Sequence, residues 1–188
     1  MRKIVSFMHL TVDGYAAGPD GEMDWIHVDD EIFDFAGDQT DHADTALYGR
    51  RTFEMMDAYW PTAADEPSAR KHDIQHSDWY NKVEKIVLSH TKKDSTKNTR
   101  FISDRVVEEI TALKQKPGKN ILMFGSPGTV QSLVQLKLVD EFWLFINPII
   151  LGKGISYWPS LTNSTKLKLI SSQTFSSGVV CVHYMRDE

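Results

Sequence analysis

The chain has 188 residues, of which 41% are hydrophobic, and a formal net charge of −5 at pH 7. This length favours a single domain over residues 1–188, and the acidic balance argues against a nucleic-acid partner, which usually requires a basic surface. A lone cysteine, Cys181, excludes an internal disulfide. The first residues lack a signal-peptide pattern and no segment has the roughly 20 apolar residues of a membrane span, so we expect a cytoplasmic protein with no membrane partner.

Strand-like and helix-like segments alternate along most of the chain. The predicted elements, in chain order, are a strand at 3–10, a helix at 29–37, a strand at 45–48, a helix at 50–58, a linker-like stretch at 61–78, a strand at 85–89, a helix at 104–114 capped by Asp104, a strand at 120–124, a helix at 129–138, and strands at 141–146, 166–170 and 179–185. This order predicts an α/β fold with a mostly parallel sheet and an antiparallel closing edge.

The loop at residues 47–52 is the first of three strand-end loops that we expect to bind a ligand, because ligands of open α/β sheets bind beyond the carboxyl ends of strands. Here a strand ends at Gly49 and a helix begins at once with Arg50 and Arg51. Free amides at a helix N-terminus attract phosphate, and two guanidinium groups strengthen that attraction. The alternative interpretation is an ordinary glycine turn with solvated arginines.

Two further loops have a similar position. Residues 125–129 read Gly-Ser-Pro-Gly-Thr, and such small residues let the backbone approach a pyrophosphate closely. Their spacing matches neither a Walker loop nor a complete dinucleotide fingerprint, and a tight turn explains them equally well. Residues 88–93 bring hydroxyls and the cations Lys92 and Lys93 to a strand end, where they could hold an adenosine ribose and its 2′-phosphate. A solvated strand end is the alternative.

Several motifs occur together in a fixed order. They are Thr11-Val12-Asp13-Gly14-Tyr15-Ala16-Ala17, then Leu138 to Phe142 running to Asn147 to Gly154, and finally Phe175-Ser176-Ser177-Gly178-Val179-Val180. This set resembles the reductase family found as the C-terminal domain of the bacterial bifunctional riboflavin-biosynthesis deaminase-reductase. The three loops also follow their strands in the order of the dihydrofolate reductase fold. The resemblance spans residues 3–184 and implies a three-layer α/β/α fold with antiparallel C-terminal strands.

The resemblance also implies an NADPH-dependent reductase of a pterin- or pyrimidine-type heterocycle. By this resemblance, Ala16, Ala17 and Trp25 line the nicotinamide side of the cofactor site. The residues implied for the phosphates and the adenosine end are Gly49, Arg50, Arg51, Thr52, Ser89, His90, Gly125, Ser126, Gly128, Thr129 and Val130. Preference for NADPH over NADH depends on Arg50, Arg51 and His90, which could read the extra phosphate.

Asp30 is the candidate substrate anchor. An ungapped alignment of Trp25 with the tryptophan of dihydrofolate reductases places Asp30 at the carboxylate that binds a 2-amino-pyrimidine edge. The alternative is that Asp29, Asp30 and Glu31 simply favour a helix N-terminus. Asp13 is a second candidate, for which we prefer a turn-stabilising role.

One segment departs from the riboflavin-pathway pattern. Where that family carries Asp-Asp-Pro-x-Leu-x-x-Arg, this chain has Gly-Arg-Arg-Thr-Phe-Glu at residues 49–54, a version that resembles dihydrofolate reductase instead. The zinc-binding deaminase half has no counterpart among the 188 residues. The first difference argues against activity on the riboflavin intermediate, and together they indicate a stand-alone relative with a different heterocyclic substrate.

Other functional classes have weaker support. His72 and His76 are four residues apart and could share a helix face as zinc ligands, but no third ligand is evident, so we expect no metal. The turn at residues 125–128 is not a Gly-x-Ser-x-Gly elbow, which argues against a serine hydrolase. The main rival is a non-catalytic NADP-binding sensor or interaction protein on the same fold. We also expect a homodimer, to which the apolar stretch 142–151 and the strands after it could contribute, although burial within one subunit explains that stretch equally well.

Overall fold

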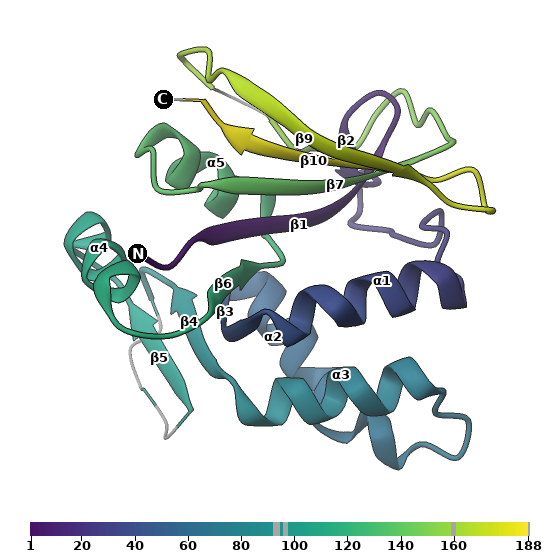
Figure 1. The fold of residues 1–188 in the computed structure, drawn as a ribbon, viewed down its shortest axis with the longest axis horizontal. Coiled ribbons are helices and arrows are strands. Elements are labelled where there is room, and N and C mark those ends of the chain that lie inside the picture. Colours follow the sequence, from purple (N-terminus) through teal and green to yellow (C-terminus); the bar gives the residue numbers. More distant parts are fainter. Residues whose placement is uncertain (92–94, 96–97, 159–160, 188) are drawn as a thin grey trace.

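A central sheet dominates the computed structural model, which describes residues 1–91, 95, 98–158 and 161–187. Within these residues eight strands pair in the order β5-β4-β3-β6-β1-β7-β10-β9 (Figure 1). Their bounds are β1 Ile4–Thr11, β3 Ala43–Gly49, β4 Glu84–Leu88, β5 Thr99–Ile102, β6 Asn120–Met123, β7 Glu141–Asn147, β9 Leu167–Thr174 and β10 Val180–Arg186. A second, two-stranded sheet joins β2 (Tyr15–Ala17) to β8 (Ile155–Ser156).

The pairing confirms a mixed, mostly parallel sheet. From β5 through β7 all neighbours are parallel, and β1 lies at the centre with Ser6 opposite Met123 on β6 and Phe142 on β7. Strands β10 and β9 run antiparallel and close the edge. Because the parallel strands share one direction, the carboxyl ends of β3, β4, β6 and β1 all meet at the same edge of the sheet.

Helices cover both faces of the sheet and form the two outer layers. They are α1 Asp30–Asp41, α2 Arg50–Tyr59, the 3-10 helix η1 Trp60–Asp65, α3 Lys71–Lys82, α4 Val106–Gln115 and α5 Pro127–Gln135. Apolar residues of α4 and α5 pack against Ile4 and Ile121, whereas α1 packs against Phe7 and Phe145. Figure 1 shows α1 and α3 together on one side of the sheet. None of the described helices combines the length and apolar character that a bilayer span requires.

The stretch 61–78 differs from the linker that its composition predicts. It contains most of η1 and the first part of α3. The buried residues of α3 are His76, Ser77 and Tyr80, so its inward face carries polar groups that a search for apolar periodicity overlooks. Strand β5 was not predicted from the sequence. The N-cap of α4 is Arg105, with φ of 45°, in place of the expected Asp104.

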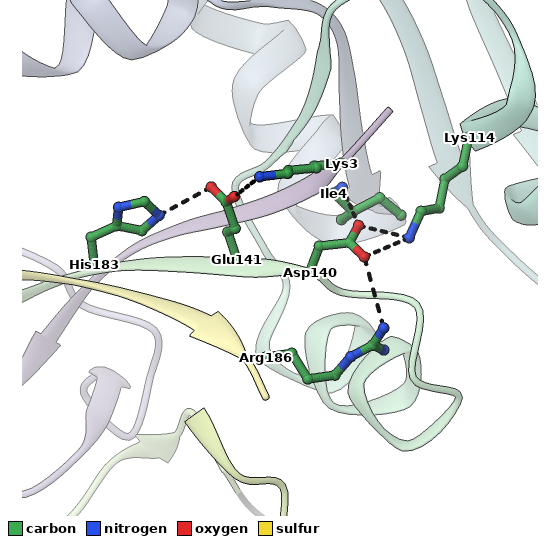
Figure 2. A network of polar contacts seen from close by, with 7 residues as sticks. All are labelled: Lys3, Ile4, Lys114, Asp140, Glu141, His183 and Arg186. Atoms are coloured by element: carbon green, nitrogen blue, oxygen red, sulfur yellow. Dashed lines mark hydrogen bonds and ion pairs between the residues drawn. The ribbon is translucent and has the colours of Figure 1, made fainter. Parts of the chain in front are cut away.

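A network of charged groups holds the edge of the sheet opposite to the three loops (Figure 2). The buried ammonium of Lys114 donates to both carboxylate oxygens of Asp140, at 2.8 and 2.6 Å, and Asp140 also accepts from the amide of Ile4 at 2.8 Å. Next to it, Glu141 accepts from Lys3 at 2.5 Å and contacts His183 at 3.0 Å. Asp140 and Glu141 therefore connect β7 to β1, α4 and β10.

Candidate functional site

Two strand-end turns touch each other at the carboxyl edge of the sheet. The amide of Gly49, at the end of β3, donates to the carbonyl oxygen of Gly125 at 3.0 Å. A Cβ atom on Gly49 would clash with the hydroxyls of Thr129 and Ser126, so only glycine allows this approach. The peptide bond between Gly125 and Ser126 is cis, and Gly125 has φ of +113°, a conformation that side chains disfavour. The first and second predicted loops therefore form one surface.

The third loop joins this surface through a cavity of about 460 Å³, which we name the outer cavity. It lies between the ends of β4 and β5 and the start of α5, and its polar lining includes Ser89, His90, Ser126, Gly128 and Thr129. The loops at 88–93 and 125–129 thus face one space. The predicted cations Lys92 and Lys93 lie outside the described residues.

A second cavity, of about 710 Å³, follows on the other side of the same turn, and we name it the middle cavity. Ser126 and Gly128 line both the outer and the middle cavity, so the two spaces meet at the N-terminus of α5. A Cβ atom built on Gly128 would find no atom within 4 Å beyond its chain neighbours and the backbone of its own helix, which means that the glycine leaves space open. The further lining includes Ala16, Ala17, Arg51, Thr52, Met55 and Ile155.

A third cavity, of about 300 Å³, lies between the sheet and helices α1, α2 and α3, and we name it the inner cavity. It shares with the middle cavity the residues Met8, Ala16, Met23, Met55 and Phe124. Most of its lining is aromatic or aliphatic, and its polar members are Thr40 and three histidines, His9, His72 and His76. The outer and middle cavities therefore follow each other along the carboxyl edge of the sheet, and the inner cavity continues from the middle one beneath the helices.

Burial keeps the histidines of the inner cavity neutral. It lowers the pKa of His9 to about 4 and that of His76 to about 3, and it also lowers the pKa of His72. At neutral pH each ring therefore offers one N–H donor and one nitrogen acceptor instead of a positive charge.

Most of the residues expected at a cofactor lie at the outer or the middle cavity, or in the turns between them. Lining residues are Ala16, Ala17, Arg51, Thr52, Ser89, His90, Ser126, Gly128 and Thr129, and Gly49 and Gly125 form the contact between the turns. Arg50 is exposed beside this surface, with its guanidinium 3.8 Å from the Glu54 carboxylate.

The structure does not bring Val130 and Trp25 to either cavity. Val130 is fully buried in the core beneath α5, and its amide donates to the carbonyl of Ser126 at 2.9 Å. The Trp25 indole donates to the Glu22 carbonyl at 3.2 Å, and Met23 from the same loop lines the middle cavity instead.

Several amides of the three loops are used within the protein itself. The Gly49 amide is used by Gly125, the Thr129 amide donates to Ser126 at 3.0 Å, and the Ser89 amide donates to Ile102 at 3.0 Å. These amides donate to backbone carbonyls of the protein itself, and the hydrogen bonds hold the turns in place. Among the described residues no N-cap side chain accepts from the first turn of α2 or α5, so those two helix ends offer an anion their first-turn amides and dipoles together with the nearby hydroxyls and arginines.

Asp30 lies outside the inner cavity. It is exposed at the first position of α1, while Asp29 caps the helix by accepting from the amide of Ile32 at 2.8 Å. The helix presents Ile32, Phe33, Ala36 and Thr40 to the cavity. Because each helical residue turns by about 100°, Asp30 is rotated away from that face. The position agrees with the alternative interpretation, an acidic first turn of the helix.

Asp13 has the structural role that we preferred. Its carboxylate accepts from the Thr11 hydroxyl at 2.7 Å and from the Gly152 amide at 2.7 Å, and these bonds lower its pKa. Asp13 thereby connects the loop after β1 to the loop after β7. The stretch Phe142–Ile146 likewise lies inside the subunit, because β7 pairs with β1 on one side and with β10 on the other.

The histidines of the inner cavity were not assigned to it from the sequence. His72 and His76 do share a helix face, as their spacing predicts, with ring centroids 5.6 Å apart. Within the described part of the chain no group of three or more metal-ligating side chains occurs, and the two rings face the inner cavity. His9 gave no signal, since a histidine on an alternating strand has no distinguishing pattern.

Comparison with known proteins agrees with this architecture. Residues 2–181 match the family described as the RibD C-terminal domain. The chain belongs to this family. The uncharacterized protein YyaP of Bacillus subtilis (strain 168) is similar to this chain. The two are 35% identical over 185 residues, which cover 97% of this chain and 94% of that protein.

Two solved structures show the same fold as this RibD C-terminal domain. One, from Shewanella sp. PV-4, carries the name of a proposed riboflavin biosynthesis protein; it is 23% identical, covers 99% of both chains and has a TM-score of 0.74. The other is dihydrofolate reductase from Enterococcus faecalis complexed with NADP(H) and RAB-propyl, 16% identical, covering 99% of this chain and 97% of that one, with a TM-score of 0.65. The three-layer, dihydrofolate reductase-like fold that the sequence predicted is thereby confirmed.

Proposed function

We propose that the protein is an NADPH-dependent reductase of a small pterin- or pyrimidine-type heterocycle. The observation that carries the proposal is the continuity of the three cavities. The outer and middle cavities share Ser126 and Gly128, and the middle and inner cavities share five further residues. An elongated dinucleotide has the shape to lie in the outer and middle cavities, with its nicotinamide end beside the inner one.

The residues around the outer and middle cavities fit a dinucleotide phosphate. The open space at Gly128 allows a pyrophosphate to approach the N-terminus of α5, and Arg51 and Thr52 contribute a charge and a hydroxyl. Ser89 and His90, on the outer side, suit a ribose and its 2′-phosphate, and Arg50 stands exposed beside the turn. The dihydrofolate reductase whose structure includes NADP(H) has the same fold and supports this assignment.

The bound cofactor would supply hydride, and the protein would hold the acceptor ring beside it. The inner cavity is the place for that ring, because it adjoins the middle cavity and is enclosed by apolar side chains of β1, α1 and α2. An apolar enclosure keeps water away from the reacting atoms. This second space beside the nicotinamide end favours a reductase over the alternative, an NADP-binding sensor.

Cofactor titration and turnover are two separable tests. We expect calorimetry to show NADPH binding, and NADPH to raise the melting temperature, because a ligand stabilises the folded state that binds it. We then expect NADPH oxidation with at least one ring from a panel of pterins, dihydrofolate and pyrimidinones. The absence of NADPH binding would reject both the reductase and the sensor, whereas binding without turnover across the panel would favour the sensor.

A further inference from the structure

The inner cavity has an unusual composition for a site that binds a nitrogen heterocycle. Among the described residues that line it, none carries a carboxylate, an ammonium or a guanidinium group. Phe7, Phe33, Trp60 and Phe124 supply flat apolar surface, and several methionines supply adaptable surface. A charged ligand group placed here would lose its hydration without gaining a countercharge, which is strongly unfavourable.

His76 is the best-defined polar group in this cavity. It is 7% exposed, and its Nε2 atom has no hydrogen-bond partner among the described residues. Trp60 holds one side of the ring at a centroid distance of 4.0 Å, and Phe124 and Trp79 pack at 5.9 and 5.3 Å. A buried nitrogen without a partner is costly to the folded protein. His76 lines the inner cavity, so a ligand whose polar edge displaces the surrounding side chains enough to reach Nε2 would remove that cost.

His9 provides a second polar group on the opposite wall, formed by the sheet. The Asn147 side chain has a defined orientation, because its oxygen accepts from the His27 amide at 2.9 Å while its nitrogen donates to the Phe145 carbonyl at 3.1 Å. That same nitrogen lies 3.3 Å from the Leu10 carbonyl and 3.3 Å from Nδ1 of His9. Because an amide nitrogen donates and cannot accept, Nδ1 faces it without a proton, and the proton of the neutral ring resides on Nε2. His9 therefore brings an N–H donor to the cavity wall.

We propose that the inner cavity selects an uncharged, unphosphorylated planar ring compound and that His76 recognises its polar edge, with His9 as the second recognition group. This inference depends on the proposed function for its identification of the ligand as the substrate. The aromatic side chains provide the stacking surface, and the volume of about 300 Å³ suits a one- or two-ring compound without a long substituent. A cationic diaminopyrimidine ring and a ribose-phosphate substrate are both disfavoured, because no countercharge faces the cavity.

Three probes of different charge test the selectivity. They are quinazolin-4-one as an uncharged fused ring, 2,4-diaminoquinazoline as a basic ring and uridine 5′-monophosphate as a phosphorylated pyrimidine. We expect calorimetry with the NADPH-saturated protein to show binding of the uncharged ring at least about tenfold tighter than that of the other two, a difference of about 1.4 kcal/mol. Equal or tighter binding of a charged probe, or binding of none of the three, would overturn the proposal.

Substitution of His76 tests the recognition group itself. His76→Phe keeps a ring of similar size and removes the unpartnered nitrogen, so we expect about a tenfold loss of affinity for quinazolin-4-one with no fall in the melting temperature. His76→Gln, which can place a polar atom near the same position, should recover part of that affinity. Gln75→Ala, on the exposed side of the same helix, is the matched control.

The outcomes separate this inference from the proposed function. NADPH affinity is measured on every variant and should stay at the wild-type value, because His76 lines neither the outer nor the middle cavity. Unchanged probe affinity in His76→Phe, or a loss of probe affinity that merely follows a loss of folding, would contradict the role of His76 while NADPH binding persists. Failure of the wild-type protein to bind NADPH would instead contradict the proposed function.

Discussion

The Gly49 amide and the Gly125 carbonyl are joined by a 3.0 Å hydrogen bond between two turns that are far apart in the sequence. This bond fixes the turn between β3 and α2 against the turn between β6 and α5. As a result, Arg51 and Thr52 from one turn and Ser126 and Gly128 from the other line the same cavity. The site that we propose for the phosphates therefore depends on two elements that meet only after the sheet has formed.

Gly128→Ala should separate cofactor binding from stability. Its Cβ atom would point into open space, so the folded protein should be unchanged or more stable by up to about 1 kcal/mol, because alanine favours a helix over glycine. The same methyl group would occupy the space that we assign to the pyrophosphate, and NADPH affinity should fall at least about tenfold. Calorimetry and thermal denaturation measure the two effects. Gly37→Ala, in α1, is the matched control, and an unchanged NADPH affinity in Gly128→Ala would contradict the assignment.

Replacing Arg50 and Arg51 together with alanine should discriminate between the two nicotinamide cofactors. NADPH carries a 2′-phosphate that NADH lacks, and a guanidinium group binds phosphate with charge-assisted hydrogen bonds. We expect loss of Arg51, which lines the middle cavity beside the proposed pyrophosphate site, to weaken both cofactors, and the double variant to lose about tenfold or more in additional affinity for NADPH alone. Both arginines are exposed, so the melting temperature should change little. An equal loss for both cofactors would mean that these arginines do not recognise the 2′-phosphate.

The buried histidines predict how stability depends on pH. Below pH 6.5 the unfolded chain protonates His76, whereas the folded protein does so only near pH 3, so acidification favours the unfolded state. The free energy of unfolding should fall by up to about 1.4 kcal/mol per pH unit from this group between pH 6.5 and about 4. His76→Phe should show a shallower decline than the wild type in urea denaturation across this range, with the contribution of His9 retained. Gln75→Ala removes no titrating group and should keep the wild-type slope; an identical slope in His76→Phe would contradict the prediction.

The network in Figure 2 predicts a variant with a purely structural defect. Lys114→Met removes the ammonium from the carboxylate of Asp140 and leaves that largely buried charge with Arg186, whose guanidinium is 3.9 Å away. Breaking one side of a buried ion pair costs about 3 kcal/mol or more of unfolding free energy. Urea denaturation should show this loss, while Lys116→Met, at an exposed position on the same helix end, should have almost none. A change in NADPH affinity of folded Lys114→Met would contradict the separation of this network from the site.

We propose that the protein forms a homodimer through β9. Within the described sheet, β9 is the last strand and pairs with β10 on one side only. The exposed fractions of its Leu169 and Ile170 are 53% and 47%. An open strand edge with apolar side chains favours pairing with a second chain. Light scattering should give the mass of two chains for the wild type and of one chain for Ile170→Lys. A single-chain mass for the wild type would contradict the proposal.

The local patterns of the sequence were sufficient for much of the fold. Apolar alternation found β1, and short apolar runs between turn residues found β3, β4, β6 and β7, because a strand buried on both faces leaves a clear trace in the sequence. Helix α3 was missed because its inward face carries His76, Ser77 and Tyr80. Helix α1 was found, but its rotation was not, and that rotation decides that Asp30 is exposed while Phe33 lines the inner cavity.

The sequence by itself determined the layers, the mostly parallel sheet and the three loops at one edge, because these follow from periodicity and turn chemistry within short segments. Only the tertiary structure decided which side chains share a cavity. His9, on a strand, and His76, on a helix far along the chain, face one space because the sheet and α3 pack across it. Such a meeting depends on the rotation and packing of whole elements, which no local pattern records.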